Sequence, residues 1–177
     1  VVENWKPMIE VQPEWEMVKL GNITLETKLW LVRNKWEQWI GNYKYLKMDA
    51  INERWALDLW KFVTIDAVDK DLVDYGLRDW DFIYNTRNAP NLVWKNTVYH
   101  WPDGEYIINN NLLRLRFDEN VVISDFVSCF LNQEEWLSQI RSFINGTTSV
   151  AALYWKDFSQ IKVPLPLKPS PIIPTIQ

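Results

Sequence analysis

The chain has 177 residues, of which 47% are apolar, and a formal net charge of −4 at pH 7, which fits one ordinary domain with a buried core. It contains no apolar stretch of the roughly 20 residues that cross a bilayer, and its first residues form neither a basic leader nor an apolar run, so we expect a cytoplasmic protein with no membrane span. One cysteine and one histidine exclude an internal disulfide and a plausible zinc cluster.

The first half of the chain is predicted to hold three strands and one short helix. Residues 1–12 form an extended lead-in, and because the chain begins with Val we expect it to be part of a longer protein. Alternating apolar and polar residues predict three half-buried strands, at residues 15–20, 43–51 and 62–65. A helix is predicted at 69–75, because Asp69 stands at its start and Gly76 just past its end.

The second half is predicted to begin with strands and to end with helices. Strand-length apolar runs lie at residues 81–85, 95–99, 105–108 and 112–117. The turn Pro102-Asp103-Gly104 predicts that the middle two form a hairpin. Helical periodicity then follows at 126–131 and 136–144, with a short helix at 156–160 and a last strand at 161–164. This order predicts an α+β fold, a small mixed or antiparallel sheet with several short helices in one domain at 13–166, followed by a proline-rich tail at 167–177.

The composition is unusual in its twelve tryptophans and five glycines, since average usage of about 7% glycine predicts on the order of twelve. Trp80, Trp94 and Trp101 stand where a turn normally takes glycine. A bulky indole at positive φ is strained. Either these turns have negative φ, or some of these positions are not tryptophan in the natural protein, which an intact mass spectrum decides.

The spacings that catalysis requires are missing. A DNA methyltransferase needs a glycine-rich turn for its cofactor and a polar-Pro-Pro-aromatic loop for the flipped base, and the nearest match, at residues 88–91, has one proline and no aromatic. A magnesium nuclease needs converging carboxylates, and the one Glu-x-Lys, at residues 26–28, follows no Pro-Asp. His100 has no nucleophile in motif context, and Cys129 lies in an apolar run typical of a buried thiol. We predict a chain that is not an enzyme and binds no cofactor or metal.

Polar loops with basic neighbours are the features that indicate binding. Residues 85–116 carry Arg87, Lys95, Arg114 and Arg116 against Asp103 and Glu105. Asn pairs bidentately with adenine, Arg with guanine, and Ser or Thr with either base or phosphate, although asparagines in loops also simply satisfy turn backbone. Arg114 and Arg116 alternate within a strand and face one way, so they either line a DNA groove or solubilise the sheet.

Four stretches in order carry a resemblance to a known family: residues 13–23, 79–88, 109–131 and 145–166. The first reads Pro-x-Trp-x-x-x-x-Leu-Gly-x-Ile. The last holds a Gly-Thr-Thr turn, a short helix and an Ile-x-Val-Pro-x-Pro strand. Together they resemble the target-recognition domain of a type I restriction-modification specificity subunit.

The resemblance implies a non-catalytic protein whose partners are double-stranded DNA, an N6-adenine methyltransferase subunit and a restriction and translocase subunit. Specificity subunits carry two such domains separated by long helices, each reading one half of a split DNA site. The family's Pro-Leu-Pro-Pro-Leu-x-x-Gln, which leads into the long helix, departs after Pro166 to Leu167-Lys168-Pro169. The chain is therefore expected to end before the spacer, or to follow a fused N6-adenine methyltransferase as its recognition domain.

The candidate DNA-binding residues all lie in polar loops. They are Asn85, Thr86, Arg87, Asn88, Lys95, Asn96, Asn109, Asn110, Gly146, Thr147 and Thr148. Arg87 is the expected anchor on a base edge or a phosphate, and Lys95 the expected phosphate contact that positions without specifying. The alternatives are a protein-interaction module that uses exposed aromatics, which suits the acidic balance, and a carbohydrate-binding module, which rests on the abundant tryptophan alone.

Overall fold

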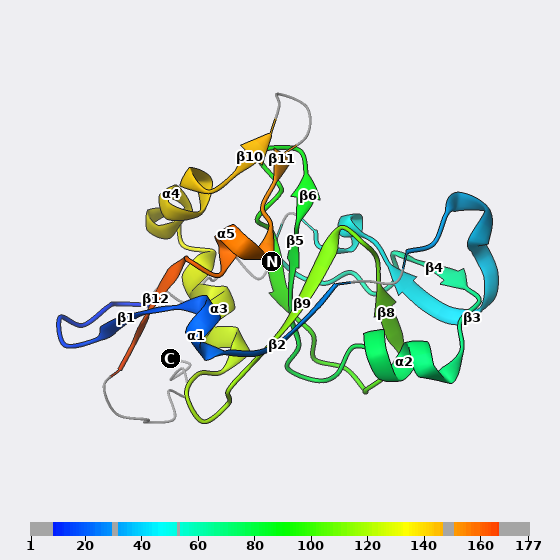
Figure 1. Ribbon diagram of the computed structural model, residues 1–177, viewed down its shortest axis with the longest axis horizontal. Coiled ribbons are helices and arrows are strands. Elements are labelled where there is room, and N and C mark those ends of the chain that lie inside the picture. The colour runs from blue at the N-terminus through cyan, green and yellow to red at the C-terminus, as the bar shows by residue number, and fades with distance from the viewer. Residues whose placement is uncertain (1–8, 30–31, 53, 147–150, 167–177) are drawn as a thin grey trace, which may run out of the picture.

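A four-stranded antiparallel sheet forms the centre of the computed structural model, which describes residues 9–29, 32–52, 54–146 and 151–166 (Figure 1). The strands, in their order across the sheet, are β2 (Thr24–Leu29), β9 (Leu112–Phe117), β5 (Phe82–Asn85) and β7 (Asn96–Val98). Sheets and helices are mixed in one domain, so the predicted α+β class is confirmed.

Three smaller sheets surround the central one. The first contains β4 (Phe62–Ile65), β3 (Gln38–Leu46) and β8 (Tyr106–Ile108), with β3 and β8 parallel. The second pairs β1 (Glu16–Lys19) with β12 (Lys162–Leu165). The third contains β10 (Asn145–Gly146), β11 (Ala151–Ala152) and β6 (Arg87–Asn88), which lie together at the top of Figure 1. The pairing of β1 with β12 thus joins the first and the last strand of the described chain. The other sheets also pair strands that are distant in the sequence.

The helices are short. They are α1 (Leu20–Ile23), α2 (Asp69–Tyr75), α3 (Ser124–Leu131), α4 (Glu134–Ser142) and α5 (Trp155–Phe158), with 3-10 turns η1 (Lys35–Glu37) and η2 (Met48–Ala50). Within the described ranges, no helix has the length and apolarity needed to cross a membrane.

Both faces of the central strands are buried, which explains why β5 is buried at all four positions. Phe82 and Tyr84 face the main core, which α3, α4, α5 and β12 also line. Ile83, between them, points to the opposite face, where Tyr99 and Leu77 belong to a second cluster. Because side chains alternate across a strand, a strand covered on both sides reads as a continuous buried run.

The predicted elements are confirmed where the signal is local. The strands at 62–65 and 112–117 and the helix at 69–75 have the predicted bounds. Gly76 follows this helix with a φ of −63°, so a left-handed cap is not the reason for glycine there. A Cβ at Gly76 would lie 2.4 Å from the carbonyl oxygen of Leu72, and this close approach requires glycine.

The predicted hairpin across residues 102–104 is wrong. β7 pairs with β5, whereas β8 pairs with β3 in the other sheet. Gly104 takes the positive φ expected of a turn, 74°, but the turn carries the chain from one sheet to the next. The strand predicted at 43–51 also differs, since β3 begins at Gln38 and ends at Leu46, before η2. Turn chemistry predicts a change of direction but not which strand lies beside which.

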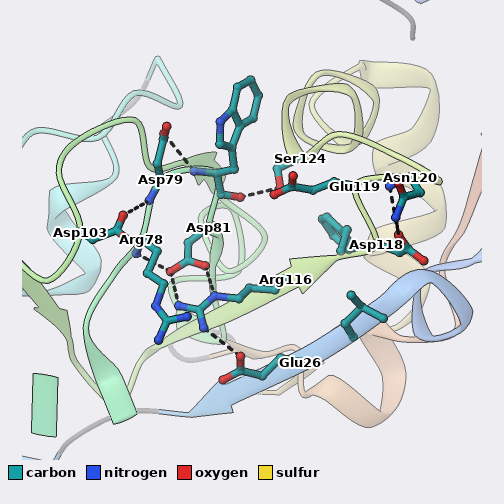
Figure 2. A pocket seen from close by; sticks show the side chains of 13 residues that line it. Glu26, Arg78, Asp79, Asp81, Asp103, Arg116, Asp118, Glu119, Asn120 and Ser124 are labelled. Atoms are coloured by element: carbon teal, nitrogen blue, oxygen red, sulfur yellow. Dashed lines mark hydrogen bonds and ion pairs between the residues drawn. The ribbon is translucent and has the colours of Figure 1, made fainter. Parts of the chain in front are cut away.

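A network of two arginines and two carboxylates lies on the second face of the central sheet beside β2, and Figure 2 shows its members Arg116, Asp81 and Glu26. Arg116 donates from Nε to Asp81 Oδ1 at 2.6 Å and from Nη1 to Glu26 Oε2 at 2.9 Å. Arg114, 1% exposed, is bonded to Glu26 and donates from Nη1 to the carbonyl oxygen of Gly76 at 2.9 Å. The two arginines do face one way, but they form ion pairs with carboxylates inside the fold. Neither of the two predicted roles, lining a DNA groove or solubilising the sheet, describes them.

The two carboxylates of this network respond differently to their surroundings. Burial alone would raise the pKa of Glu26, but the Arg114 and Arg116 guanidinium groups outweigh it, and the pKa is lowered. Asp81 is 1% exposed, and its burial raises the pKa because the hydrogen bond from Arg116 offsets the loss of water only in part. Asp81 is therefore the member whose charge depends most on its partners.

Three tryptophans have positive φ: Trp39 at 68°, Trp55 at 64° and Trp80 at 69°. They are all the non-glycine residues with positive φ in the described part of the chain. For Trp94 and Trp101 the explanation by negative φ is confirmed, and for Trp80 it is wrong. That position 80 is not tryptophan in the natural protein stays a prediction, which extends to positions 39 and 55, since glycine alone adopts this conformation without strain.

We predict that Trp39→Gly stabilises the protein. Trp39 is 71% exposed, so few contacts are lost, while relief of a left-handed conformation is worth about 1 kcal/mol. Chemical denaturation measures the free energy of unfolding. Trp60→Gly is the matched control, because Trp60 is 90% exposed and is not among the residues with positive φ. A loss of stability in Trp39→Gly equal to that in the control contradicts the prediction.

We predict that Asp81→Asn lowers the free energy of unfolding by about 3–5 kcal/mol, because it leaves Arg114 buried with one fewer carboxylate. Asp74→Asn is the control, since its ion pair with Lys28 spans 3.8 Å at the surface and is worth about 1 kcal/mol or less. Thermal and urea unfolding of both variants measure the difference. Equal losses in the two variants would show that the buried network does not stabilise the fold.

Candidate nucleic-acid interface

The polar segments predicted to bind DNA converge at the end of β5. The backbone N–H of Asn85 donates to the carbonyl oxygen of Lys95 at 2.8 Å, and that of Thr86 donates to the carbonyl oxygen of Asn111 at 2.8 Å. β6 then pairs with β11, which pairs with β10. Segments 85–88, 95–96, 109–111 and 145–146 therefore meet in one region, although they are up to 60 residues apart in the sequence.

The chain leaves the central sheet at Thr86 and forms a new sheet immediately. The carbonyl oxygen of Thr86 accepts a hydrogen bond from the N–H of Leu153 at 2.9 Å. Arg87 then lies opposite Ala152, and Asn88 opposite Ala151. Of the two side chains of β6, that of Arg87 is exposed and that of Asn88 is half-buried.

Five of the predicted residues are buried: Asn85, Thr86, Lys95, Asn96 and Asn109. Asn96 donates from Nδ2 to Asn132 Oδ1 at 2.9 Å and accepts from Ser128 Oγ at 2.8 Å, which ties β7 to α3. Asn109 Oδ1 accepts from the N–H of Asn111 at 3.0 Å. The side-chain amides of Asn96 and Asn109 hold the loops in place, so burial limits these two amides to positioning.

Arg87 is exposed and is held by a residue that the sequence did not single out. Its Nη2 donates to the hydroxyl oxygen of Tyr154 at 2.8 Å, and its guanidinium carbon lies 5.4 Å from the centre of the same ring. Tyr154 is 45% exposed. A guanidinium oriented by an aromatic ring loses little freedom when it binds a ligand. Asn88 and Asn110 are half-buried beside this region.

A hollow of about 330 Å³ lies next to β6, and we call it the lysine hollow. Its polar lining consists of Asn52, Lys61, Asn88, Lys95 and Asp49, and its apolar lining of Met48, Ile51 and Leu92. Lys95, a predicted phosphate contact, thus lies beside Lys61 and Asn52, which the sequence did not indicate. Residue type gave no signal for these two, because they come from a segment in which acids outnumber bases.

A second hollow, of about 580 Å³, is acidic and excludes phosphate (Figure 2). Six of its described lining residues are acids and two are arginines: Glu26, Asp79, Asp81, Asp103, Asp118, Glu119, Arg78 and Arg116. The guanidinium group of Arg116 forms ion pairs with Asp81 and Glu26. A polyanion is repelled from such a surface.

Two predicted residues, Thr147 and Thr148, lie outside the described residues, as do residues 167–177 of the proline-rich tail and residues 1–8 of the lead-in. Gly146 is the second residue of β10, opposite Ala151.

His100 and Cys129, the residues considered for catalysis, have the surroundings of side chains that stabilise the fold. His100 lies between Asp79, 3.2 Å from Nδ1, and Asp125, 3.0 Å from Nε2. Burial raises the pKa of the Cys129 thiol, which is the opposite of the activation that a nucleophile needs. In the part of the chain that the structure describes, no three His, Cys, Asp or Glu residues are grouped as metal ligands.

Comparison with known proteins shows likeness of fold. No family model and no curated protein matches the sequence. Among solved structures, the HsdS subunit from Thermoanaerobacter tengcongensis matches 90% of this chain and 35% of its own at 17% identity, with a TM-score of 0.59. The type I restriction-modification S subunit from M. genitalium matches 93% and 37% at 11% identity, with a TM-score of 0.55.

A third structure concerns the complex assembly and conformational transition of the type I R-M system. It matches 90% of this chain and 36% of its own at 19% identity, with a TM-score of 0.58. The chain therefore spans a little over a third of the length of each of these three proteins. It shares the fold of a part of type I specificity subunits, as the resemblance of its sequence predicted.

We predict that Asn96→Ala lowers the free energy of unfolding by about 2 kcal/mol, because it leaves the buried Asn132 and Ser128 groups with fewer partners. Asn88→Ala is the control. Asn88 is half-buried, and its Oδ1 accepts one local bond, from the N–H of Ala89 at 2.8 Å, so we expect a loss below about 1 kcal/mol. Urea denaturation compares the two, and a smaller loss in Asn96→Ala would refute a structural role for that amide.

Proposed function

We propose that this chain binds double-stranded DNA in a sequence-specific manner and reads one half of a bipartite target site. The observation that carries this proposal is the convergence of polar loops from four parts of the sequence on one side of the central sheet. Phosphate contacts position a protein on DNA, and contacts to base edges specify the sequence. The interface offers groups for both tasks.

The shared fold supports a place for the chain in a type I restriction-modification complex. In this proposal the domain does no chemistry and binds no cofactor. An N6-adenine methyltransferase, as a separate subunit or as a fused domain, transfers the methyl group, and a restriction and translocase subunit cuts. The complex acts in the cytoplasm, where chromosomal DNA is accessible.

The exposed and buried candidates have different tasks in the proposal. Arg87, oriented by Tyr154, contacts a guanine edge or a phosphate, and Asn88 and Asn110 offer amides to neighbouring bases. Gly146, Thr147 and Thr148 stay predicted contacts of the DNA backbone, and of the three Gly146 lies in β10, which pairs with β11. The buried amides of Asn85, Asn96 and Asn109, with Thr86, fix the loops, and this rigidity keeps the reading groups in one geometry.

Exposed apolar residues favour a second candidate function, a protein-interaction module. Leu29, Val32, Trp36, Trp39 and Ile40 are 44–78% exposed and lie within twelve residues of one another. Clusters of this kind mark docking surfaces. Salt separates the two functions, because duplex binding through several phosphates weakens steeply as salt rises, while an apolar interface responds little.

We predict that Arg87→Ala weakens binding to the preferred duplex by about 1–3 kcal/mol and relaxes preference at one base pair. The preferred sequence is first selected from a pool of random duplexes with the unaltered chain, and fluorescence anisotropy then measures affinity for single-base variants. Arg78→Ala is the charge-matched control, because Arg78 lines the acidic hollow.

Two results would contradict the proposed function. One is selection that enriches no sequence from the pool at low salt. The other is an unchanged preference in Arg87→Ala together with an unchanged affinity, which would remove Arg87 from the interface. Transfer of methyl groups by the purified chain alone would contradict its non-catalytic role.

A further inference from the structure

We propose that the lysine hollow is a phosphate-binding site in which Lys61 and Lys95 hold one stretch of the DNA backbone next to the residues that read bases. This inference rests on the proposed function and deepens it, because it separates the part that anchors from the part that specifies. It adds Lys61 and Asn52 to the interface.

The polar lining of the hollow is arranged to donate hydrogen bonds. Asn52 Oδ1 already accepts from the N–H groups of Arg54 at 2.8 Å and Ala56 at 3.1 Å. Asn88 Oδ1 accepts from the N–H of Ala89 at 2.8 Å. With the amide oxygens engaged by the backbone, the amide groups have NH₂ donors left for a ligand.

The charged residues of the hollow, like its amide donors, suit an anionic ligand. Its described lining includes two lysines, the exposed Lys61 and the buried Lys95, and one carboxylate, of Asp49. Ammonium and amide donors together match a phosphate oxygen, which only accepts. Apolar side chains of Met48, Ile51 and Leu92 complete the lining, and they lower the local dielectric and strengthen the attraction.

The position of the hollow connects it to the reading residues. Asn88 belongs both to β6, beside Arg87, and to the lining. Met48 belongs to the lining, and its carbonyl oxygen accepts from Asn85 Nδ2 at 3.4 Å. The hollow therefore adjoins the strand that carries Arg87, and in this proposal a single DNA strand passes both.

Lys61→Ala tests the proposal, because Lys61 is exposed and its loss leaves the core intact. Binding to labelled duplexes is measured from about 50 to 200 mM salt. We expect affinity at about 0.1 M salt to fall about five- to tenfold for preferred and unrelated duplexes alike, and the slope of log affinity against log salt to decrease by about 1. Asp49→Asn removes the opposing charge and is expected to change affinity in the opposite direction.

Lys70→Ala is the matched control, since Lys70 is an exposed lysine on α2, which does not line the hollow. Specific binding with the same salt slope in Lys61→Ala and the control overturns the inference and leaves the proposed function intact. Binding without sequence preference, weakened by Lys61→Ala, supports the phosphate site and overturns the proposed function. A chain that binds no duplex overturns both.

A small phosphorylated ligand is the other source of the same chemistry. Titration with thymidine monophosphate and with inorganic phosphate, followed by amide chemical shifts, tests it. Saturable binding of the mononucleotide that Lys61→Ala abolishes, with duplex affinity unchanged in that variant, would assign the hollow to a small ligand and overturn the DNA assignment.

Discussion

Burial of both faces of the central sheet is the constraint on which the rest of the fold depends. β5 and β9 carry apolar side chains into the main core on one face, and on the other face Ile83 and Leu112 enter a second apolar cluster beside the charged Arg114 and Arg116 of β9. A buried arginine is tolerated only where carboxylates and carbonyl oxygens surround it. Asp81, Glu26 and the carbonyl of Gly76 supply these partners for Arg114 and Arg116, so that the network joins β2, β9, the residue before β5 and the residue after α2.

The same constraint explains why the candidate interface lies at the end of β5. A strand buried on both faces cannot continue with exposed polar side chains, so the chain must leave the sheet where asparagine, threonine and arginine begin. At Asn85 and Thr86 the polar groups are still internal and bond to loops, and at Arg87 they reach the surface. The two buried residues Asn85 and Thr86 thus separate the sheet from the exposed Arg87, and their hydrogen bonds fix the backbone that carries Arg87.

The sequence predicted local features better than pairings. The bounds of β4, β9 and α2 follow from alternation, period and a terminal glycine within a few residues. The parallel pairing of β3 with β8 and the bond between Arg114 and Glu26, 88 residues apart, depend on distant contacts that such patterns do not encode. For the interface, residue type located the loops but could not tell the buried amide of Asn96 from the half-buried one of Asn88, because asparagine serves backbone and ligand with the same two groups.

Net charge is a poor guide to the partner of a protein whose charges are segregated. The chain carries −4 overall, yet its acids gather around one hollow, and lysine and amide donors gather around another. At about 0.1 M salt, exposed charges interact over about 10 Å, so a phosphate at the lysine hollow is affected mainly by the groups that line it. In the proposed function the acidic hollow restrains orientation, because it disfavours those approaches of DNA that bring phosphates to its carboxylates.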